Sequence, residues 1–101
     1  MTEQICSREM LISVITDLLR RYSAERAILF GSYARREADA RSDIDLIVIG
    51  GSGFDPTDVF CMADDLHRIT GKDVDVYELR EIDQDSEFFR TILREGVPIA
   101  A

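Results

Sequence analysis

The sequence is poor in the residues that mark disulfide scaffolds and low-complexity proteins. It has no tryptophan, two prolines, two cysteines and one histidine in 101 residues. The cysteines, Cys6 and Cys61, do not have the spacing of metal ligands and are too few for a disulfide framework. We therefore expect both to be free thiols in a reducing compartment. Cys61 falls among apolar residues of a predicted helix, which indicates a packing role.

Basic residues are also scarce relative to acidic ones. The chain has 12 Lys and Arg against 20 Asp and Glu, which gives a net charge of −8. Affinity for nucleic acid depends on many contacts from Lys and Arg to phosphates, so we expect no stable binding to DNA or RNA. The acidic excess favours solubility or a basic partner.

Long apolar runs are absent as well. No run approaches the roughly 18 residues of a membrane-spanning helix, and the first residues lack the basic and apolar segments of a signal peptide. We therefore expect a cytoplasmic protein that does not associate with membranes. With 101 residues, of which 46% are hydrophobic, the chain can form one small core. We assign residues 1–101 to a single domain.

Hydrophobic periodicity predicts alternating helices and strands. The predicted elements are a helix over 7–22, a strand over 26–30, a short helix from 32 to about 37, a strand over 43–49, a helix opened by Asp55 and Pro56 and ended by Gly71, a strand over 73–77 and a helix over 85–95. This order predicts an α+β (mixed α/β) fold, in which helices cover a mixed sheet of about three or four strands.

Each long helix is expected to bury the apolar residues that recur at helical spacing. These residues are Met10, Leu11, Val14, Ile15, Leu18, Leu19 and Tyr22 in the first helix, Val59, Phe60, Ala63, Leu66 and Ile69 in the second, and Phe88, Phe89, Ile92 and Leu93 in the last. Ser7 is the predicted N-cap of the first helix, and Asp85 or Ser86 that of the last. The residues after Pro98 form a short apolar tail.

Two aspartates, Asp43 and Asp45, open the strand predicted over residues 43–49. Residues two apart in a strand point to the same face, so these carboxylates lie side by side and repel one another. A divalent cation removes the repulsion, and Mg²⁺ prefers a few carboxylates together with substrate phosphate oxygens. Alternatively, Asp43 ends a turn and Asp45 lies exposed on an edge strand, which a bare Asp-x-Asp pair favours.

Gly31 and Ser32 follow the strand predicted over residues 26–30. Glycine lets the backbone approach a ligand closely, and Ser32 can cap a short helix whose free amides attract phosphate. Alone, the pair fits a turn without a ligand. The next basic residues, Arg35 and Arg36, suit phosphate geometry, although both could lie on a solvated helix face.

The combination is more specific than its parts. Gly31-Ser32, followed after ten residues by Asp43-x-Asp45, resembles the signature of the nucleotidyltransferase superfamily related to DNA polymerase β. The wider wording, Gly-Ser-Tyr-Ala-Arg and then Ser-Asp-Ile-Asp-Leu, resembles its smallest branch, the minimal nucleotidyltransferase (MNT) domains. Arg36 departs from this pattern, because the family usually has Gly there to relax the backbone after a short helix.

The resemblance implies a third carboxylate on the next strand. Asp75, between two valines, matches that position best, and Asp73 is the fallback; both could also be charges at a strand edge. The implied catalytic and metal-binding residues are Asp43, Asp45 and Asp75, which would hold one or two Mg²⁺ ions. The implied ATP-binding residues are Gly31, Ser32, Arg35 and Arg36. His67 could act as a general base, although metal-assisted transfer does not require one.

The resemblance also implies a reaction, the transfer of a nucleoside monophosphate to an acceptor with release of pyrophosphate. MNT domains are typically encoded beside a HEPN-domain ribonuclease. In such toxin–antitoxin pairs the MNT antitoxin transfers AMP from ATP to a tyrosine of the toxin, so a hetero-oligomer is implied. Two alternatives stay open. One is an antitoxin that acts by binding alone. The other is an adenylyltransferase for an aminoglycoside-like small molecule, which could work as a homo-oligomer.

Overall fold

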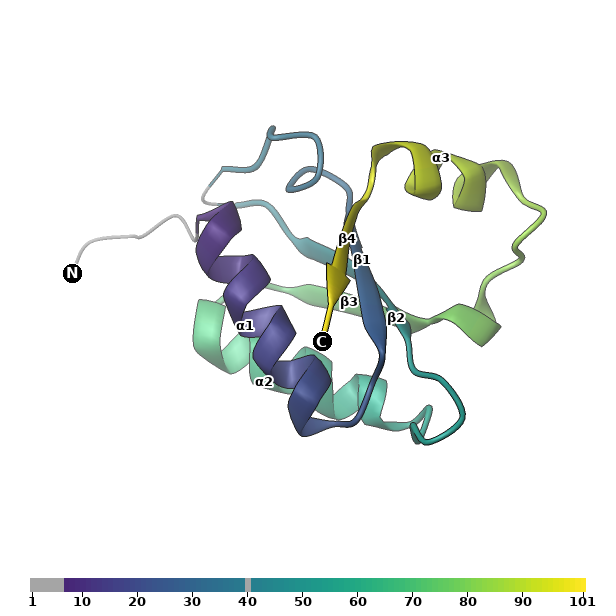
Figure 1. Ribbon diagram of the computed structural model, residues 1–101. Helices are drawn as coiled ribbons and strands as arrows, with labels where there is room; N and C mark the ends of the chain where they lie inside the picture. Colours follow the sequence, from purple (N-terminus) through teal and green to yellow (C-terminus); the bar gives the residue numbers. More distant parts are fainter. Residues whose placement is uncertain (1–6, 40) are drawn as a thin grey trace.

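The computed structural model describes residues 7–39 and 41–101, and it places helices on both faces of one sheet (Figure 1). In chain order the elements are α1 (Arg8–Arg21), β1 (Arg26–Phe30), β2 (Ile44–Ile49), α2 (Asp58–Thr70), β3 (Val74–Glu78), the 3-10 turn η1 (Leu79–Glu81), α3 (Glu87–Glu95) and β4 (Val97–Ala100). None of the helices in these ranges is long and apolar enough to cross a membrane.

The sheet has four strands in the order β3-β2-β1-β4. The β1 strand pairs with β2 and β4 antiparallel, whereas β2 pairs with β3 parallel. This confirms the predicted mixed sheet. The β4 strand was not predicted, because Gly96 and Pro98 indicated only the end of the last helix. Gly96 does end α3, and the tail after it then extends along β1, with Val97 opposite Leu29.

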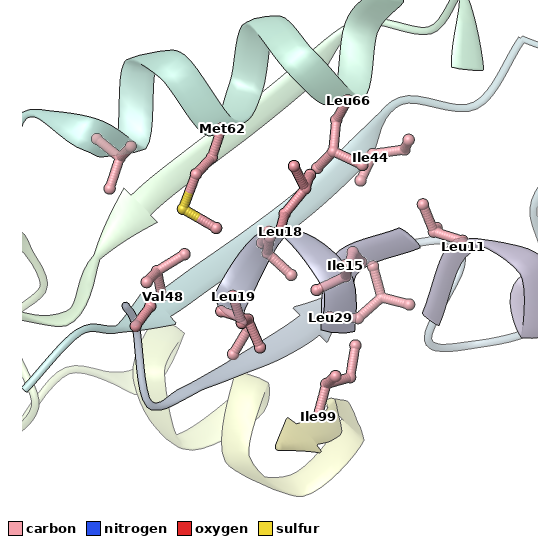
Figure 2. Close-up of a cluster of buried hydrophobic side chains, with 14 of the residues drawn as sticks. Leu11, Ile15, Leu18, Leu19, Leu29, Ile44, Val48, Met62, Leu66 and Ile99 are labelled. Atoms are coloured by element: carbon pink, nitrogen blue, oxygen red, sulfur yellow. The ribbon is translucent and has the colours of Figure 1, made fainter. Parts of the chain in front are cut away.

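The larger core lies between the sheet and the pair of helices α1 and α2 (Figure 2). Its fully buried side chains include Leu11, Ile15 and Leu19 of α1, Leu29 of β1, Ile44, Leu46 and Val48 of β2, and Met62 and Leu66 of α2. The alternate residue Ile47 faces the other way, into a smaller core formed with Ile28, Phe89 and Ile92 beneath α3. Period-two alternation in β2 therefore assigns its side chains to two separate cores.

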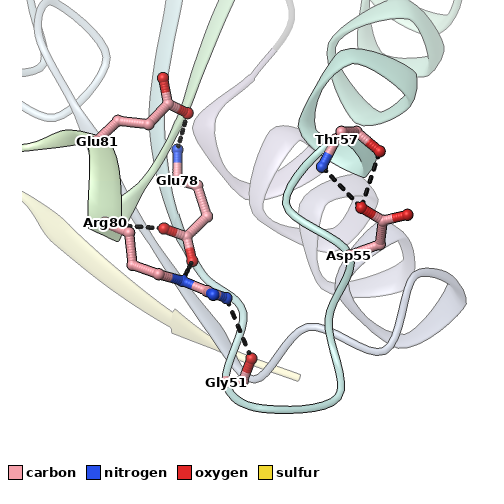
Figure 3. Close-up of polar contacts among 6 residues, drawn as sticks. All are labelled: Gly51, Asp55, Thr57, Glu78, Arg80 and Glu81. Carbon is pink, nitrogen blue, oxygen red and sulfur yellow. Dashed lines mark hydrogen bonds and ion pairs between the residues drawn. The ribbon is translucent and has the colours of Figure 1, made fainter.

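Capping residues fix the helix ends. Ser7 accepts a hydrogen bond from the Met10 amide and Ser86 from the Phe89 amide, as N-caps do. Gly71 ends α2 in the left-handed conformation, with φ of 73°. The start of α2 differs from the prediction, because the Asp55 carboxylate accepts hydrogen bonds from the amide and hydroxyl of Thr57 and closes a turn before the helix (Figure 3).

Several residues predicted to be buried are exposed. They are Met10, Phe60, Ile69, Phe88 and Leu93, each more than half exposed. Cys61 is also exposed, so its predicted packing role was wrong, and Cys6 lies outside the described residues. Each helix contacts the sheet along a narrow stripe. In α2 that stripe centres on Val59, Met62 and Leu66, and Met62 fills the place expected for Phe60.

A polar network holds the end of β3. The Glu78 carboxylate is 2% exposed and accepts hydrogen bonds from the Arg80 backbone amide and from Arg80 Nε (Figure 3). The Glu78 amide donates to Glu81 Oε1 at 3.0 Å. Arg80 also reaches the Gly51 carbonyl at 3.5 Å. Because the charge of Glu78 is paired and hydrogen-bonded, its burial is tolerated, and β3 is anchored at the end remote from Asp75.

Candidate active site

Two of the predicted metal-binding aspartates lie side by side in the sheet. Asp45 of β2 and Asp75 of β3 are partners in the parallel register. Asp45 alternates with residues of the larger core, so it points to the α3 side of the sheet. Asp43 directly precedes β2 and is exposed, as is Asp75, whereas Asp45 is half-buried. The backbone thus brings all three to one end of the β2–β3 pair.

Their charges act on one another. Burial raises the pKa of the Asp45 carboxyl above its usual value, and the nearby charges of Asp75 and Asp43 raise it further. Arg35 acts in the opposite direction and lowers the pKa, but its effect is the smallest of the four. Asp73 is not among the causes. The site therefore concentrates negative charge that the neighbouring guanidinium does not offset.

The donor set fits Mg²⁺, because carboxylate oxygens are the hard ligands that this ion prefers. As the side chains stand, no group of three or more His, Cys, Asp or Glu residues within 7–39 and 41–101 could hold a metal ion. Like charges separate adjacent carboxylates, and an aspartate can turn between rotamers. Asp43, Asp45 and Asp75 would therefore have to turn toward a shared ion as it binds.

Gly31 fits closely against this carboxylate cluster. Its φ is +74°, and a Cβ built on it would collide with Asp45 Oδ2. Both facts require glycine at this position: the first because L residues are strained in the left-handed region, the second because there is no space for a side chain. The Gly31 backbone therefore lies against the Asp45 carboxylate, with no room for a side chain between them.

The segment after Gly31 is a series of turns, so the helix predicted from residue 32 to about residue 37 was wrong. The Arg35 amide bonds the Gly31 carbonyl at 3.1 Å, and the Glu37 amide bonds the Ser32 carbonyl at 2.9 Å. The first hydrogen bond spans four residues and the second spans five, so no regular helix continues from this turn. Arg36 has φ of 59°. The position where the resemblance led us to expect glycine thus has a backbone conformation that favours glycine.

The predicted phosphate-binding residues lie in this turn. Gly31 and Arg35 line the same small cavity, and Ser32 is half-buried. Arg35 Nε pairs with Glu37 Oε1 at 2.7 Å, with both side chains largely exposed. Arg36 is also exposed. Exposed ion pairs contribute little energy, so Arg35 can exchange its carboxylate partner for an anionic ligand at small cost.

A residue that the sequence reasoning missed is Lys72, the chain's single lysine. It is 7% exposed and donates to the carbonyls of Asp39 and Ser42 at 3.1 and 3.2 Å. Its ammonium also lies 5.6 Å from the centre of the Tyr33 ring. Lys72 therefore holds the loop that leads into Asp43. The signal that could have revealed it is a lone lysine directly before Asp73.

An open cavity of about 620 Å³ lies beside the aspartates, and Asp43, Asp73, Asp75 and His67 are among its lining residues. His67 Nδ1 lies 2.7 Å from the Lys72 carbonyl. Because a carbonyl only accepts, Nδ1 donates this hydrogen bond. The fallback ligand Asp73 thus shares a cavity with Asp75, but only Asp75 lies opposite Asp45 in the sheet.

Comparison with known proteins matches most of the chain. The profile of the family described as "Polymerase beta, Nucleotidyltransferase" matches residues 13–101. A relative from Methanocaldococcus jannaschii, named "Putative protein adenylyltransferase", is 38% identical over 68 residues, which is 67% of this chain and 73% of the relative.

Solved structures agree with the fold. A structure named "putative minimal nucleotidyltransferase" is 32% identical, with a TM-score of 0.72 and 91% of each chain covered. A toxin–antitoxin structure with AMP-PNP is 26% identical, with a TM-score of 0.72 over 86% of this chain and 70% of that one. A Shewanella oneidensis complex of tri-AMPylated HEPN toxin and MNT antitoxin, 24% identical, shares the fold with a TM-score of 0.67, over 90% of this chain and 70% of that one. This chain belongs to the polymerase β nucleotidyltransferase family, and its enzyme class is nucleotidyltransferase.

Proposed function

We propose that this chain is a Mg²⁺-dependent protein adenylyltransferase that transfers AMP from ATP to a tyrosine of a HEPN-domain toxin. The observation that carries the proposal is the placement of Asp45 opposite Asp75, with Asp43 two residues before and Gly31 packed against the Asp45 carboxylate. Concentrated carboxylate charge next to a backbone that can approach phosphates is what nucleotidyl transfer requires.

Each group has a definite role in this proposal. Asp43, Asp45 and Asp75 hold the ion or ions, which supply Lewis-acid activation of the attacking hydroxyl and charge neutralisation at the phosphorus. Gly31 and Ser32 present backbone amides to the triphosphate, and Arg35 and Arg36 offset its charge. The acceptor hydroxyl loses its proton to solvent and its oxygen forms a bond to the α-phosphorus of ATP, the bond from that phosphorus to the bridging oxygen breaks, and pyrophosphate leaves.

The partner is proposed from the relatives. The similar proteins include one named "Putative protein adenylyltransferase", a toxin–antitoxin structure with AMP-PNP and an AMPylated HEPN toxin with its MNT antitoxin. All of them match this chain, which carries the motifs Gly31-Ser32 and Asp43-x-Asp45. A macromolecular acceptor also suits the open, acidic cavity of about 620 Å³ beside the aspartates.

The test is a transfer assay read by intact mass. The chain is incubated with ATP, Mg²⁺ and the HEPN protein encoded beside it, and a gain of one or more AMP units on the HEPN protein is expected. Chelation of Mg²⁺ and the Asp43→Asn/Asp45→Asn double variant should each abolish the gain. A stable complex that silences a ribonuclease without any gain in mass would instead establish inhibition by binding alone. Neither a gain nor a complex would redirect the search to small-molecule acceptors.

A matched pair of variants tests the third ligand. Asp75→Asn should reduce transfer at least 100-fold, because it removes a carboxylate next to Asp45, whereas Asp73→Asn should stay within about tenfold of the unaltered chain. Both residues are exposed on the same cavity, so loss of folding should affect neither variant. The reverse ranking would assign the role to Asp73.

A further inference from the structure

A second cavity adjoins the phosphate-binding turn on the α3 side of the sheet. Its volume is about 240 Å³, and its lining includes Gly31 and Arg35 of the turn and Phe88, Thr91 and Glu95 of α3. A Cβ built on Gly31 would collide with Asp45 Oδ2, so Gly31 is a neighbour both of this cavity and of the Asp45 carboxylate. Nothing in the proposed mechanism uses the α3 residues.

The apolar wall of this cavity is aromatic. The Phe30 and Phe88 rings are 5.8 Å apart at 86°, an edge-to-face contact, and the Phe30 and Tyr77 rings are 6.4 Å apart. Edge-to-face contacts fix the orientation of a ring. Phe88 is nevertheless 51% exposed. A fixed aromatic side chain that stays exposed offers a surface on which a planar ring can stack.

The same wall carries polar groups on the next turns of α3. Thr91 Oγ1 accepts from Arg94 at 3.5 Å, which leaves its hydroxyl hydrogen able to donate elsewhere. The Glu95 side chain has no hydrogen bond or ion pair to the rest of residues 7–39 and 41–101. Thr91 and Glu95 therefore offer one donor and one acceptor at the edge of the aromatic surface, a pattern complementary to the edge of a nucleobase.

The size of the cavity restricts its ligand. Pockets that enclose whole drug-sized molecules have volumes of about 300–1,000 Å³, and this one has about 240 Å³. It suits one ring system rather than a complete nucleotide. A triphosphate at Gly31 and Arg35 leaves the remainder of the nucleotide to be placed, and this cavity is the adjoining space.

We propose that this cavity is the nucleobase subsite, in which the base stacks on Phe88 and a base that carries an exocyclic amino group donates it to Glu95. The inference rests on the proposed nucleotidyl transfer and extends it to base selection. Phe88 and Glu95 are specificity-determining residues, and neither belongs to the catalytic machinery. Bases without an amino group at that edge leave Glu95 without a partner and bind more weakly.

The experiment measures the affinity of the full chain for Mg-ATP and for inorganic tripolyphosphate with Mg²⁺, which has no base. Phe88→Ala should weaken ATP binding at least fivefold, because loss of base–aromatic stacking costs roughly 5- to 150-fold. Binding of tripolyphosphate should not change. Leu93→Ala is the matched control, since Leu93 lies on the same helix with similar exposure, 58% against 51%, but lines a different cavity.

A second comparison tests Glu95. ATP and ITP differ at the base by an amino group, so the unaltered chain should bind ATP more tightly than ITP. Glu95→Gln should reduce that preference at least threefold, because the amide presents a donor as well as an acceptor. Glu87→Gln, at the other end of α3, should leave the preference unchanged.

The outcomes separate this inference from the proposed function. If ATP and tripolyphosphate both bind and Phe88→Ala affects neither, the base lies elsewhere and this inference is overturned, while the transfer site stands. If neither ligand binds with Mg²⁺, the proposed function itself fails. A loss of ATP affinity that is equal in Phe88→Ala and Leu93→Ala would show a general disturbance of α3 and would also overturn the base assignment.

Discussion

The Asp45 carboxylate occupies the space where a side chain on residue 31 would begin. This contact joins the two motifs on which the site depends, because Gly31 directly follows β1 and Asp45 lies on β2, where it is paired with Phe30. Any side chain at residue 31 must displace the carboxylate or the turn.

We therefore expect Gly31→Ala to destabilise the fold by about 1–2 kcal/mol, the cost of a left-handed conformation for an L residue. Transfer should fall about 100-fold, because displacement of a catalytic group by roughly 1 Å has effects of that size. Denaturant unfolding and the mass assay measure the two effects. Gly53→Ala is the control, since a Cβ there meets nothing within 4 Å. Equal behaviour of the two variants would contradict the close packing described at Gly31.

Replacement of Arg36 by glycine should stabilise the fold without improving function. Its φ of 59° costs about 1–2 kcal/mol for an L residue. Glycine removes that cost, but part of the stability gained is lost again because glycine raises the conformational entropy of the unfolded chain. Arg36→Gly should therefore raise the free energy of unfolding by about 0.5–1 kcal/mol. Arg36→Lys keeps the strain and should change nothing. If Arg36 contacts the triphosphate, Arg36→Gly should at the same time weaken ATP binding, which Arg36→Lys should preserve.

Removal of the Lys72 ammonium should loosen the loop before Asp43. Lys72→Met loses hydrogen bonds to the Asp39 and Ser42 carbonyls, and hydrogen bonds to charged groups contribute about 1.5–3 kcal/mol each at most. We expect a loss of about that size in unfolding free energy, together with reduced transfer. Arg41→Met, an exposed basic residue of the same loop, should stay within about 0.5 kcal/mol. Unchanged stability of Lys72→Met would show that water can replace the ammonium.

Tyr22 should make stability depend on pH at the alkaline end. Its hydroxyl donates to Asp65 Oδ2 at 2.6 Å and joins α1 to α2. This hydrogen bond, with burial and the charge of Asp65, raises the Tyr22 pKa to about 12. Because the folded pKa exceeds the unfolded value, the contribution is complete below about pH 10 and is lost as the pH rises toward 12.

The measurement compares Tyr22→Phe with the unaltered chain across that range. At neutral pH the variant should be less stable by about 0.5–1.5 kcal/mol, and the difference should shrink between pH 10 and 12. Tyr77→Phe is the control, because the Tyr77 hydroxyl makes no hydrogen bond to other described residues. A difference between Tyr22→Phe and the unaltered chain that stays constant with pH would contradict the role of this hydrogen bond.

Local signals in the sequence were sufficient for most of the fold. Periodicity located α1, β1, β2 and α3 closely, and Ser7, Gly71 and Ser86 marked helix ends as capping rules predict. The β4 strand was not predicted, because a segment of four residues that includes a proline does not by itself indicate a strand. It forms a strand only because the edge of β1 is available for pairing. Phe60 and Phe88 were misassigned for a related reason. Spacing identifies a face, but the packing of the sheet decides how wide that face is.

The candidate site was likewise predictable only in part. The motifs placed Asp43, Asp45 and Gly31, whose proximity depends on two adjacent strands. The role of Lys72 could not be predicted, because it depends on a loop 30 residues earlier in the chain. The cavity beneath α3 likewise has both Gly31 and Glu95 in its lining, a relation that only the folded chain defines.

The position of β3 at the open edge of the sheet has a further consequence. Edge strands present unpaired amides and carbonyls on which another chain can add a strand, and charged side chains discourage that addition. Asp75 is exposed on β3, Asp73 is exposed directly before it, and Pro98 lies on the opposite edge strand, β4. We therefore expect Asp73 and Asp75 also to protect the sheet from edge-to-edge association, and variants that neutralise them to aggregate more readily.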